Sequence, residues 1–341
     1  MQKVTNHTPL AVAMAVLPNK DGVDTFYVVV KATYALRPAV ALAAEQVAPF
    51  LTDEYFGDPA ASSLKYAAEM HVGKLGTDVA LVGHARPPGG RTVPELLVQV
   101  NVAGRSKAIR VLGNRVWRSD GTCSRPQPFE SMPLVFERAY GGVHQAGKNG
   151  RPLVEERNPV GVGFQGQRST GEMVGDAVAN LEDPQRPVAK LGDVQIPVGF
   201  GFVAPGWMPR RQFAGTYDEA WQKQRAPYLP VDFDLRFSNA AVAELCFPRP
   251  LAGGERIEVI GASGEGPLRF ALPTLQPRVT VKVAGAPERP PTQLETVLIE
   301  PDQNRFCLSW RAELLCDRKV MRLEETIIEA DGLDAPARAP A

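Results

Sequence analysis

Glycine and proline constrain the fold of this chain more than any other residues do. The 341 residues include 31 of each. Both interrupt helices, and proline also lacks the N–H group that a central strand must donate. The chain therefore favours short elements joined by fixed turns, and a helical bundle is disfavoured. With 44% hydrophobic and 22% charged residues, it has the composition of a globular protein that can bury a sizeable core.

Strand patterns dominate the first third of the chain. Residues 26–36 (FYVVVKATYAL) are rich in β-branched and aromatic side chains, and residues 78–84 (DVALVGH) have the same character. Residues 96–102 and 107–112 form a predicted hairpin, whose first arm alternates polar with apolar residues as in a sheet with one solvent-exposed face. The apolar run 10–17 is too short to span a bilayer, and we interpret it as part of the fold rather than as a targeting segment.

Strand patterns return in the last third, over residues 256–260, 268–272, 278–284, 293–300 and 305–310. The last two segments flank turn-forming residues and form a second predicted hairpin. The sequence thus predicts a mainly β (β-rich α+β) fold, with antiparallel, sandwich-like sheets, an irregular Gly/Pro-rich centre and a few short helices. We expect one domain over residues 1–334, either undivided or with two β-rich subdomains (about 1–125 and 251–334) around the centre (126–250). The Pro/Ala-rich residues 335–341 are expected to be disordered.

Two short helices are predicted in the centre. Residues 172–181 carry apolar residues at helical spacing. Residues 216–219 (TYDE) match the S/T-x-x-E capping box, in which Thr216 would begin a helix that Pro227 ends. On this interpretation, replacing Thr216 by alanine would cost about 0.5–2 kcal/mol of stability.

Charge and cysteine content argue against several classes of partner. The 38 basic and 38 acidic residues balance, so we expect no nucleic-acid partner and no membrane insertion. The charge is nevertheless uneven, because residues 86–118 hold seven basic residues against one acidic residue, and residues 293–334 hold ten acidic against five basic. These stretches are either solvated strand faces or complements to a charged partner. The four scattered cysteines form no C-x-x-C pair, which favours reduced thiols in a cytoplasmic protein.

Signatures of catalysis and of cofactor binding are largely missing. The sequence has no phosphate-binding loop of the G-x-x-x-x-G-K-[ST] type, no G-x-S-x-G elbow and no H-E-x-x-H zinc helix. Residues 161–166 (GVGFQG) match G-x-G-x-x-G in form, but without the required strand and long helix, so a structural loop is expected. The histidines His7, His71, His84 and His144 lack metal-ligand spacing. We therefore expect no metal and no cofactor.

Three carboxylates keep an enzymatic alternative open. Asp232 and Asp234 would share one face of an extended segment, and Glu137 lies in a separate polar cluster. Paired carboxylates can serve as acid and base, so the alternative function is a hydrolase acting on cell-wall or carbohydrate substrates. The two aspartates can equally pair with Arg225 or Arg236. Nothing in the sequence demands catalysis.

Several segments resemble one protein family in the same order along the chain. They are residues 133–142 (PLVFERAYGG), 158–164 (NPVGVGF), 180–184 (NLEDP), 197–210 (PVGFGFVAPGWMPR) and 215–241 (GTYDEAWQKQRAPYLPVDFDLRFSNAA), together with the strand 26–36 and residues 82–94. The family is that of the type VI secretion effector adaptors, or chaperones, long catalogued as a domain of unknown function. The resemblance extends from about residue 28 to residue 329.

The resemblance implies a cytoplasmic adaptor of a Gram-negative bacterium that uses no cofactor. Such an adaptor would bind the N-terminal or linker region of an effector toxin and assist its loading onto the PAAR tip or the trimeric spike protein. A structural component of the secretion spike is a further alternative. Secretion into the medium would favour the spike component, whereas retention in the cytosol would favour the adaptor.

Candidate protein-binding residues lie in the motif-rich centre. Glycines and prolines there permit and stiffen unusual loops, and aromatic residues supply the large apolar area that dominates interfaces. Arginine side chains can hold carboxylates or main-chain carbonyl groups. The same residues can instead belong to the core. The candidates are Arg138, Tyr140, Trp207, Arg210, Tyr217, Trp221, Tyr228 and Phe233.

Overall fold

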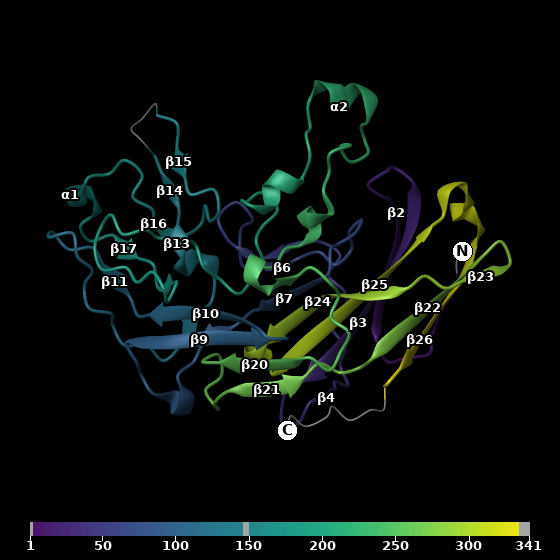
Figure 1. The fold of residues 1–341 in the computed structure, drawn as a ribbon, viewed down its shortest axis with the longest axis horizontal. Helices are drawn as coiled ribbons and strands as arrows, with labels where there is room; N and C mark the ends of the chain where they lie inside the picture. Colours follow the sequence, from purple (N-terminus) through teal and green to yellow (C-terminus); the bar gives the residue numbers. More distant parts are fainter. Residues whose placement is uncertain (1–2, 146–149, 334–341) are drawn as a thin grey trace.

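The computed structural model describes residues 3–145 and 150–333. Within these ranges the chain is mainly β, as predicted, with three larger sheets and several two-stranded ladders (Figure 1). The predicted disordered tail, residues 335–341, lies outside the described residues. None of the helices in the described ranges is long and apolar enough to cross a membrane.

The largest sheet joins the two ends of the sequence. Its order is β19 (Cys246–Phe247), β7 (Thr77–Leu81), β24 (Thr292–Glu300), β25 (Arg305–Leu315), β3 (Asp24–Ala35) and β2 (Ala11–Pro18), with β4 (Ala41–Leu42) paired to β3. β3 lies between two neighbours and is buried on both faces, which explains its continuous apolar run. The charge of its buried Lys31 is compensated by Glu69, with 3.0 Å between Nζ and Oε2.

The predicted hairpin of residues 293–310 forms from β24 and β25. The chain turns through η6 (Pro301–Gln303) and through Asn304, whose φ of 51° is left-handed. The apolar run 10–17 is a strand too, since it forms most of β2. The predicted strand 78–84 is divided. β7 ends at Leu81, and β8 (His84–Ala85) pairs with Met132 and Pro133 outside the largest sheet.

A five-stranded sheet lies beside the largest one. Its order is β18 (Leu181–Glu182), β10 (Arg105–Leu112), β9 (Glu95–Val102), β20 (Arg256–Ile260) and β21 (Leu268–Ala271). The predicted alternation along β9 is confirmed, because Val98, Val100 and Val102 are buried while the residues between them are partly exposed. Ala103 and Gly104 both have positive φ and make the tight turn between β9 and β10.

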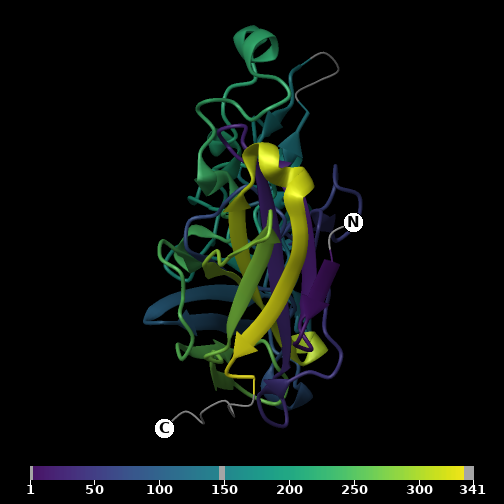
Figure 2. The same cartoon turned by 90° about the vertical axis from the view of Figure 1, so that its right-hand side faces the viewer.

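A four-stranded sheet and a shared core complete the β-structure. The sheet order is β1 (Lys3–Asn6), β26 (Leu323–Asp331), β22 (Gln276–Val283) and β23 (Ala286–Glu288), and Figure 2 shows β26 running along one side of the molecule. One hydrophobic cluster contains Val30 of β3, Val100 of β9 and Val281 of β22. The three sheets therefore pack around a common interior.

Outside the three larger sheets the chain consists of very short elements, most of them in the centre. The two-stranded ladders are β8 with β12 (Met132–Pro133), β11 (Arg115–Val116) with β17 (Ala177–Val178), β13 (Tyr140–Gly141) with β16 (Val162–Gly163), β14 (Val143–His144) with β15 (Leu153–Val154) and β5 (Glu54–Tyr55) with β6 (Leu64–Tyr66). The helices are α1 (Thr170–Met173) and α2 (Glu219–Gln224), and the remaining 3-10 turns are η1 (Pro88–Gly90), η2 (Phe136–Arg138), η3 (Arg210–Phe213), η4 (Leu235–Ser238), η5 (Ala243–Leu245) and η7 (Asp317–Arg322).

The prediction of a helix over residues 172–181 is wrong. α1 ends at Met173, and Gly175 follows with a φ of 89° that a helix does not accommodate. The apolar residues after it join strands instead, because Val178 pairs with Arg115 and Leu181 pairs with Val111. A true capping box lies at the start of α1, where the Ser169 and Glu172 side chains each bond the other residue's main-chain N–H.

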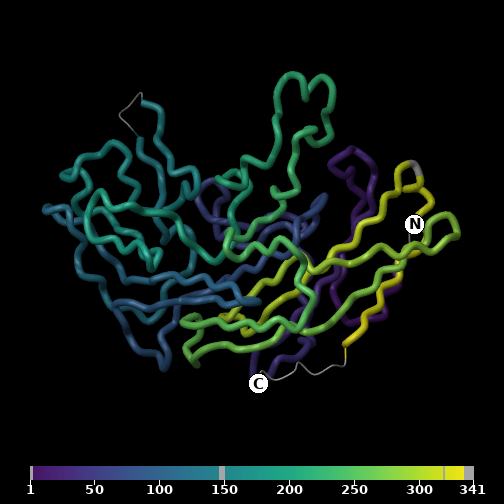
Figure 3. Tube along the Cα trace, viewed as in Figure 1, coloured from purple at the N-terminus to yellow at the C-terminus, as the bar shows by residue number. Residues whose placement is uncertain are grey.

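The predicted capping box at Thr216 is also wrong, although the helix exists. Asp218 is the N-cap of α2, and its side chain accepts a 2.8 Å hydrogen bond from Trp221 N. Thr216 Oγ1 donates to Asp232 Oδ2 at 2.7 Å, which closes the base of the loop of residues 215–232. α2 lies at the tip of this α2 loop, which projects away from the sheets (Figure 3).

Candidate functional site

A cleft of about 990 Å³ lies between the five-stranded sheet and the irregular centre. β10 contributes Ser106, Lys107 and Ala108 to its lining, and η5 contributes Ala243 and Glu244. Most of the remaining lining comes from residues 126–250. We call this hollow the central cleft.

Four of the segments that carry the family resemblance converge on the central cleft. Residues 133–142 contribute Phe136, and residues 180–184 contribute Asp183 and Pro184. Residues 197–210 provide seven lining residues, among them Val198 and Met208, and residues 215–241 provide three. Segments far apart in the sequence thus form one concave surface.

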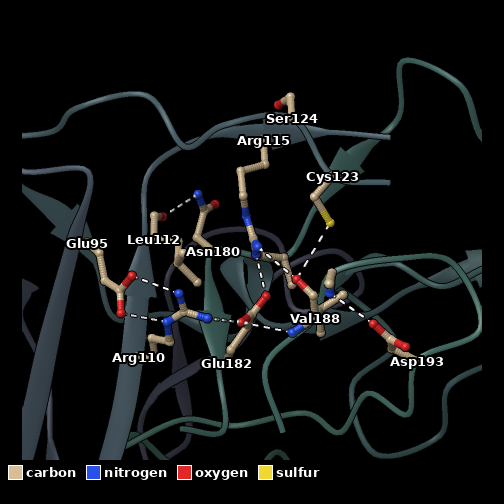
Figure 4. A network of polar contacts seen from close by, with 12 residues as sticks. Glu95, Arg110, Leu112, Arg115, Cys123, Ser124, Asn180, Glu182, Val188 and Asp193 are labelled. Atoms are coloured by element: carbon tan, nitrogen blue, oxygen red, sulfur yellow. Dashed lines mark hydrogen bonds and ion pairs between the residues drawn. The ribbon is translucent and has the colours of Figure 1, made fainter. Parts of the chain in front are cut away.

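A buried ion pair between β11 and β18 fixes one wall of the central cleft (Figure 4). Arg115 Nη2 donates to Glu182 Oε1 at 2.5 Å and to Ala179 O at 2.7 Å. Glu182 also accepts a hydrogen bond from Val188 N. Its carboxylate therefore holds together the two ends of the loop that runs from Glu182 to Val188. The loop continues into the cleft-lining residues 196–199. Its position is therefore set by a charge pair on the strand ladder and not by regular secondary structure.

Arg138, a predicted binding residue, belongs to the support of the same wall. Its Nη1 lies 3.4 Å from Asn180 Oδ1 and 3.5 Å from Asn114 Oδ1. Asn180 Nδ2 in turn donates to Leu112 O at 2.9 Å (Figure 4). These bonds tie residues 136–142 to the end of β10, so the contacts of Arg138 within the chain are structural.

Asn158 joins two of the family-like segments to each other. Its buried Nδ2 donates to Phe136 O at 2.8 Å and to Tyr140 O at 2.9 Å. A Cβ on Gly141 would lie 2.1 Å from Asn158 O, so only glycine fits there. Tyr140 packs edge-on against Phe164, with ring centroids 6.4 Å apart, and burial raises the pKa of its hydroxyl. These motif residues specify the local fold.

Trp207, Arg210 and Phe233 are buried in the interior. Trp207 packs edge-on against Phe136, with 5.6 Å between the ring centroids, and Phe233 contacts Phe237 in the same way. Arg210 lines the cleft, although only 8% of the residue is exposed.

The other three aromatic candidates lie on the α2 loop. Tyr217 is 54% exposed and Tyr228 is 41% exposed, and Trp221 is half-buried between them. The Tyr217 and Trp221 rings are 4.7 Å apart, and Trp221 Nε1 donates to Tyr228 O at 2.9 Å. The structure thus divides the eight candidates among the cleft, its support and a projecting loop.

The carboxylates of the enzymatic alternative each have a local partner. Glu137 accepts hydrogen bonds from Ser63 N and Ser63 Oγ, at 2.7 and 2.6 Å. Hydrogen bonds from Thr216 lower the pKa of Asp232, and the bond from Arg236 lowers that of Asp234. A general acid needs the opposite shift. Arg225, the other proposed partner, donates to main-chain carbonyls instead.

Two features of the cleft were not predicted from the sequence. Phe136, Val198 and Arg236 line it but were not among the candidates, although all three lie inside the family-like segments. The sequence predicts β10 as a strand, but it does not predict that the edge of this strand lines a cleft. Only the placement of residues 126–250 beside that edge reveals it.

Comparison with known proteins gives a family for this chain. No curated protein and no solved structure matches it significantly. A family model described as an uncharacterized protein conserved in bacteria (DUF2169) matches residues 21–311. That range covers most of the chain, and the protein belongs to this family.

Proposed function

We propose that the protein is an adaptor that binds a type VI secretion effector toxin and assists its loading onto the PAAR tip or the trimeric spike protein. The family-like segments of the sequence support this role. The observation that carries the proposal is that four of these segments converge on the central cleft. A surface built by the most distinctive segments is the natural place for the shared task of the family.

The chemistry of the cleft suits the binding of a polypeptide. Its lining includes both apolar side chains, such as Ile196, Val198 and Phe213, and charged ones, such as Lys107 and Arg236. The wall is held by the Arg115–Glu182 pair, so little ordering is needed when a partner binds. A stable complex requires about 1,200–2,000 Å² of buried surface, which the cleft together with the projecting α2 loop would help to supply.

The adaptor acts in the cytoplasm in this proposal. It covers apolar surface of the toxin before export, because such surface otherwise leads to aggregation. It then stays behind when the loaded spike leaves the cell. A structural spike component would instead appear in the medium.

Co-expression with the toxin encoded beside it tests the proposal. We expect the two proteins to elute as one complex and the yield of soluble toxin to rise. Separate elution together with an unchanged toxin yield would contradict the adaptor role.

Two variants of one loop locate the contact. Ile196 lines the cleft, whereas Val194 is 70% exposed and lies outside its lining. Ile196→Asp should weaken the complex at least about tenfold, since a charge replaces apolar contact area. Val194→Asp should leave it unchanged. Equal effects of the two substitutions would place the contact elsewhere.

A further inference from the structure

Arg210 brings a positive charge to the central cleft without a carboxylate partner. Its Nε donates to Phe237 O at 2.7 Å and its Nη1 to Val203 O at 2.9 Å. Among the residues that the structure describes, no carboxylate oxygen lies within 4.0 Å of the guanidinium, whose two hydrogen bonds use Nε and Nη1. Arginine stays protonated, and the guanidinium carbon lies 5.1 Å from the centroid of the Phe237 ring, so this buried cation is in contact with an aromatic face and main-chain carbonyls but has no ion pair.

The nearest acidic groups are engaged with other donors. Asp53 and Asp78 act on Arg210 only through longer-range attraction. Asp78 accepts from Ala240 N at 2.7 Å and lies 3.1 Å from Lys74 Nζ, and Asp53 accepts from Ala68 N at 2.8 Å. Neither carboxylate can turn to Arg210 without leaving a main-chain N–H unpaired.

The other cations around the cleft have acidic partners. Lys107 lies 2.7 Å from Glu244, Arg157 lies 2.6 Å from Glu155, and Arg236 lies 2.6 Å from Asp234. The opposite charges of each pair cancel locally. Arg210 is therefore the charge that a ligand of the cleft must complement.

The edge of β10 adds main-chain hydrogen-bonding groups to the same cleft. Val102 and Arg105 flank the two-residue turn, and in such a hairpin they bond each other. The alternation then points the N–H and C=O groups of Ser106 and Ala108 away from β9. Leu112, an even number of residues further along β10, also points its N–H away from β9 and donates to Asn180 O at 2.8 Å. In the described chain, β18 pairs with β10 only at Arg110 and Val111, so this edge is open at Ser106 and Ala108.

We propose that the central cleft receives an extended segment of the partner that carries an aspartate or glutamate. The segment adds a strand to β10 at Ser106 and Ala108, and its carboxylate binds the Arg210 guanidinium. An open sheet edge is a common template for such strand addition. A carboxylate matches the arginine side chain through charge-assisted hydrogen bonds. The inference rests on the proposed adaptor function, for which it names the chemistry of the recognised segment.

Synthetic peptides test the site without the toxin. The probes are acetylated, amidated six-residue peptides of alternating Thr and Val, with one Asp placed at each position in turn, and the same set with Asn. In an NMR titration of the full chain, the best Asp peptide should bind at least about tenfold more tightly than its Asn counterpart. The amide signals of Ser106 and Ala108 should shift. Equal binding of the two sets, or no binding, would overturn the inference.

Matched variants separate the two contacts. Arg210→Gln should abolish the preference for Asp, while Arg211→Gln, at the exposed neighbouring arginine, should keep it. Ala108→Pro removes an outward N–H and should weaken all peptides. Ala271→Pro is the control. Ala271 lies on β21, the other edge strand of the same sheet, and the alternation along that strand points its N–H away from β20. Thermal melting checks that each variant folds. If Arg210→Gln does not fold, the comparison of Asp and Asn peptides on the unmodified chain remains decisive.

The inference and the adaptor function can fail separately. Peptide binding as described, without a complex between the chain and the toxin, would refute the adaptor function alone. A toxin complex that Arg210→Gln and Ala108→Pro leave equally tight, with no preference for Asp peptides, would refute the assignment of the cleft alone.

Discussion

Aromatic residues in the centre of this chain have different roles: some belong to the core and others are exposed. Trp207 and Phe233 are each 8% exposed, whereas Tyr217 is 54% exposed on the α2 loop. The sequence places all three in family-like segments rich in glycine and proline. Their local patterns do not distinguish a core aromatic from an exposed one, because burial depends on which distant segment packs against each ring.

This division predicts opposite effects of two truncations. Trp207→Ala should lower the free energy of unfolding by about 3–5 kcal/mol, because it removes a buried ring that packs on Phe136. Tyr217→Ala should change it by no more than about 0.5 kcal/mol. Urea denaturation measures both. A small loss for Trp207→Ala would show that the ring is not part of the core.

A prediction for α2 follows from its observed N-cap. Asp218→Ala should destabilise the helix by about 1 kcal/mol, since the Trp221 N–H loses its acceptor, whereas Asp218→Asn should retain most of the cap. Amide exchange over α2 should then accelerate about fivefold in the alanine variant only. Unchanged exchange in Asp218→Ala would mean that another group caps the helix.

At the scale of the elements, the longer strands were predictable and the short ladders were not. The patterns of residues 26–36, 96–102 and 293–300 correspond to β3, β9 and β24, because burial of one or both faces leaves a local signal. The ladders of the centre contain two residues per strand. Side-chain bonds such as those of Asn158 hold them, and such bonds connect positions that no local pattern relates. The family-like segments identified the cleft-forming regions, but not the surface that they make.

One carboxylate links three strands of the four-stranded sheet and should make it sensitive to acid. Glu325 of β26 lies 2.9 Å from Lys3 of β1 and 2.6 Å from Lys282 of β22. Hydrogen bonds from Lys282, Lys3 and Thr5 lower the pKa of Glu325 from 4.5 to about 2. Because the pKa is lowered on folding, the stabilisation is complete above pH 4.5 and is lost as the pH falls towards 2.

The corresponding experiment compares the wild type with Glu325→Gln. Urea midpoints measured between about pH 5 and pH 2.5 should fall more steeply in the wild type, because the variant has no carboxylate to protonate at this position. The two proteins should differ most at the upper end of this range. Parallel curves would show that Glu325 has an ordinary pKa.

At the scale of the whole molecule, the α2 loop meets the rest of the chain at its base and at the turn between β2 and β3, where Arg225 Nη2 donates to Lys20 O at 2.8 Å. Its base is closed by the hydrogen bonds between Thr216 and Asp232, so a short linker can replace residues 217–231. We expect such a variant to melt within roughly 3 °C of the wild type. If the exposed aromatic residues bind the proposed toxin partner, the affinity of the complex should fall at least about tenfold.

An exposed ion pair on α2 provides the control for this deletion. Glu219 and Lys223 lie 2.6 Å apart, and both are exposed. Replacing both by glutamine should leave toxin affinity unchanged, as measured by calorimetric titration. Full toxin affinity after removal of the loop would assign binding to other surfaces.

The pairing of strands from opposite ends of the sequence affects how the protein can be made. β3 is synthesised before the centre of the chain and its neighbour β25 only after it, and the same is true of β1 and β26. The nascent chain therefore cannot complete the largest sheet and the four-stranded sheet until β25 and β26 have been synthesised. A ribosome that stalls in the centre of the message would release a product with exposed strands and no complete interior.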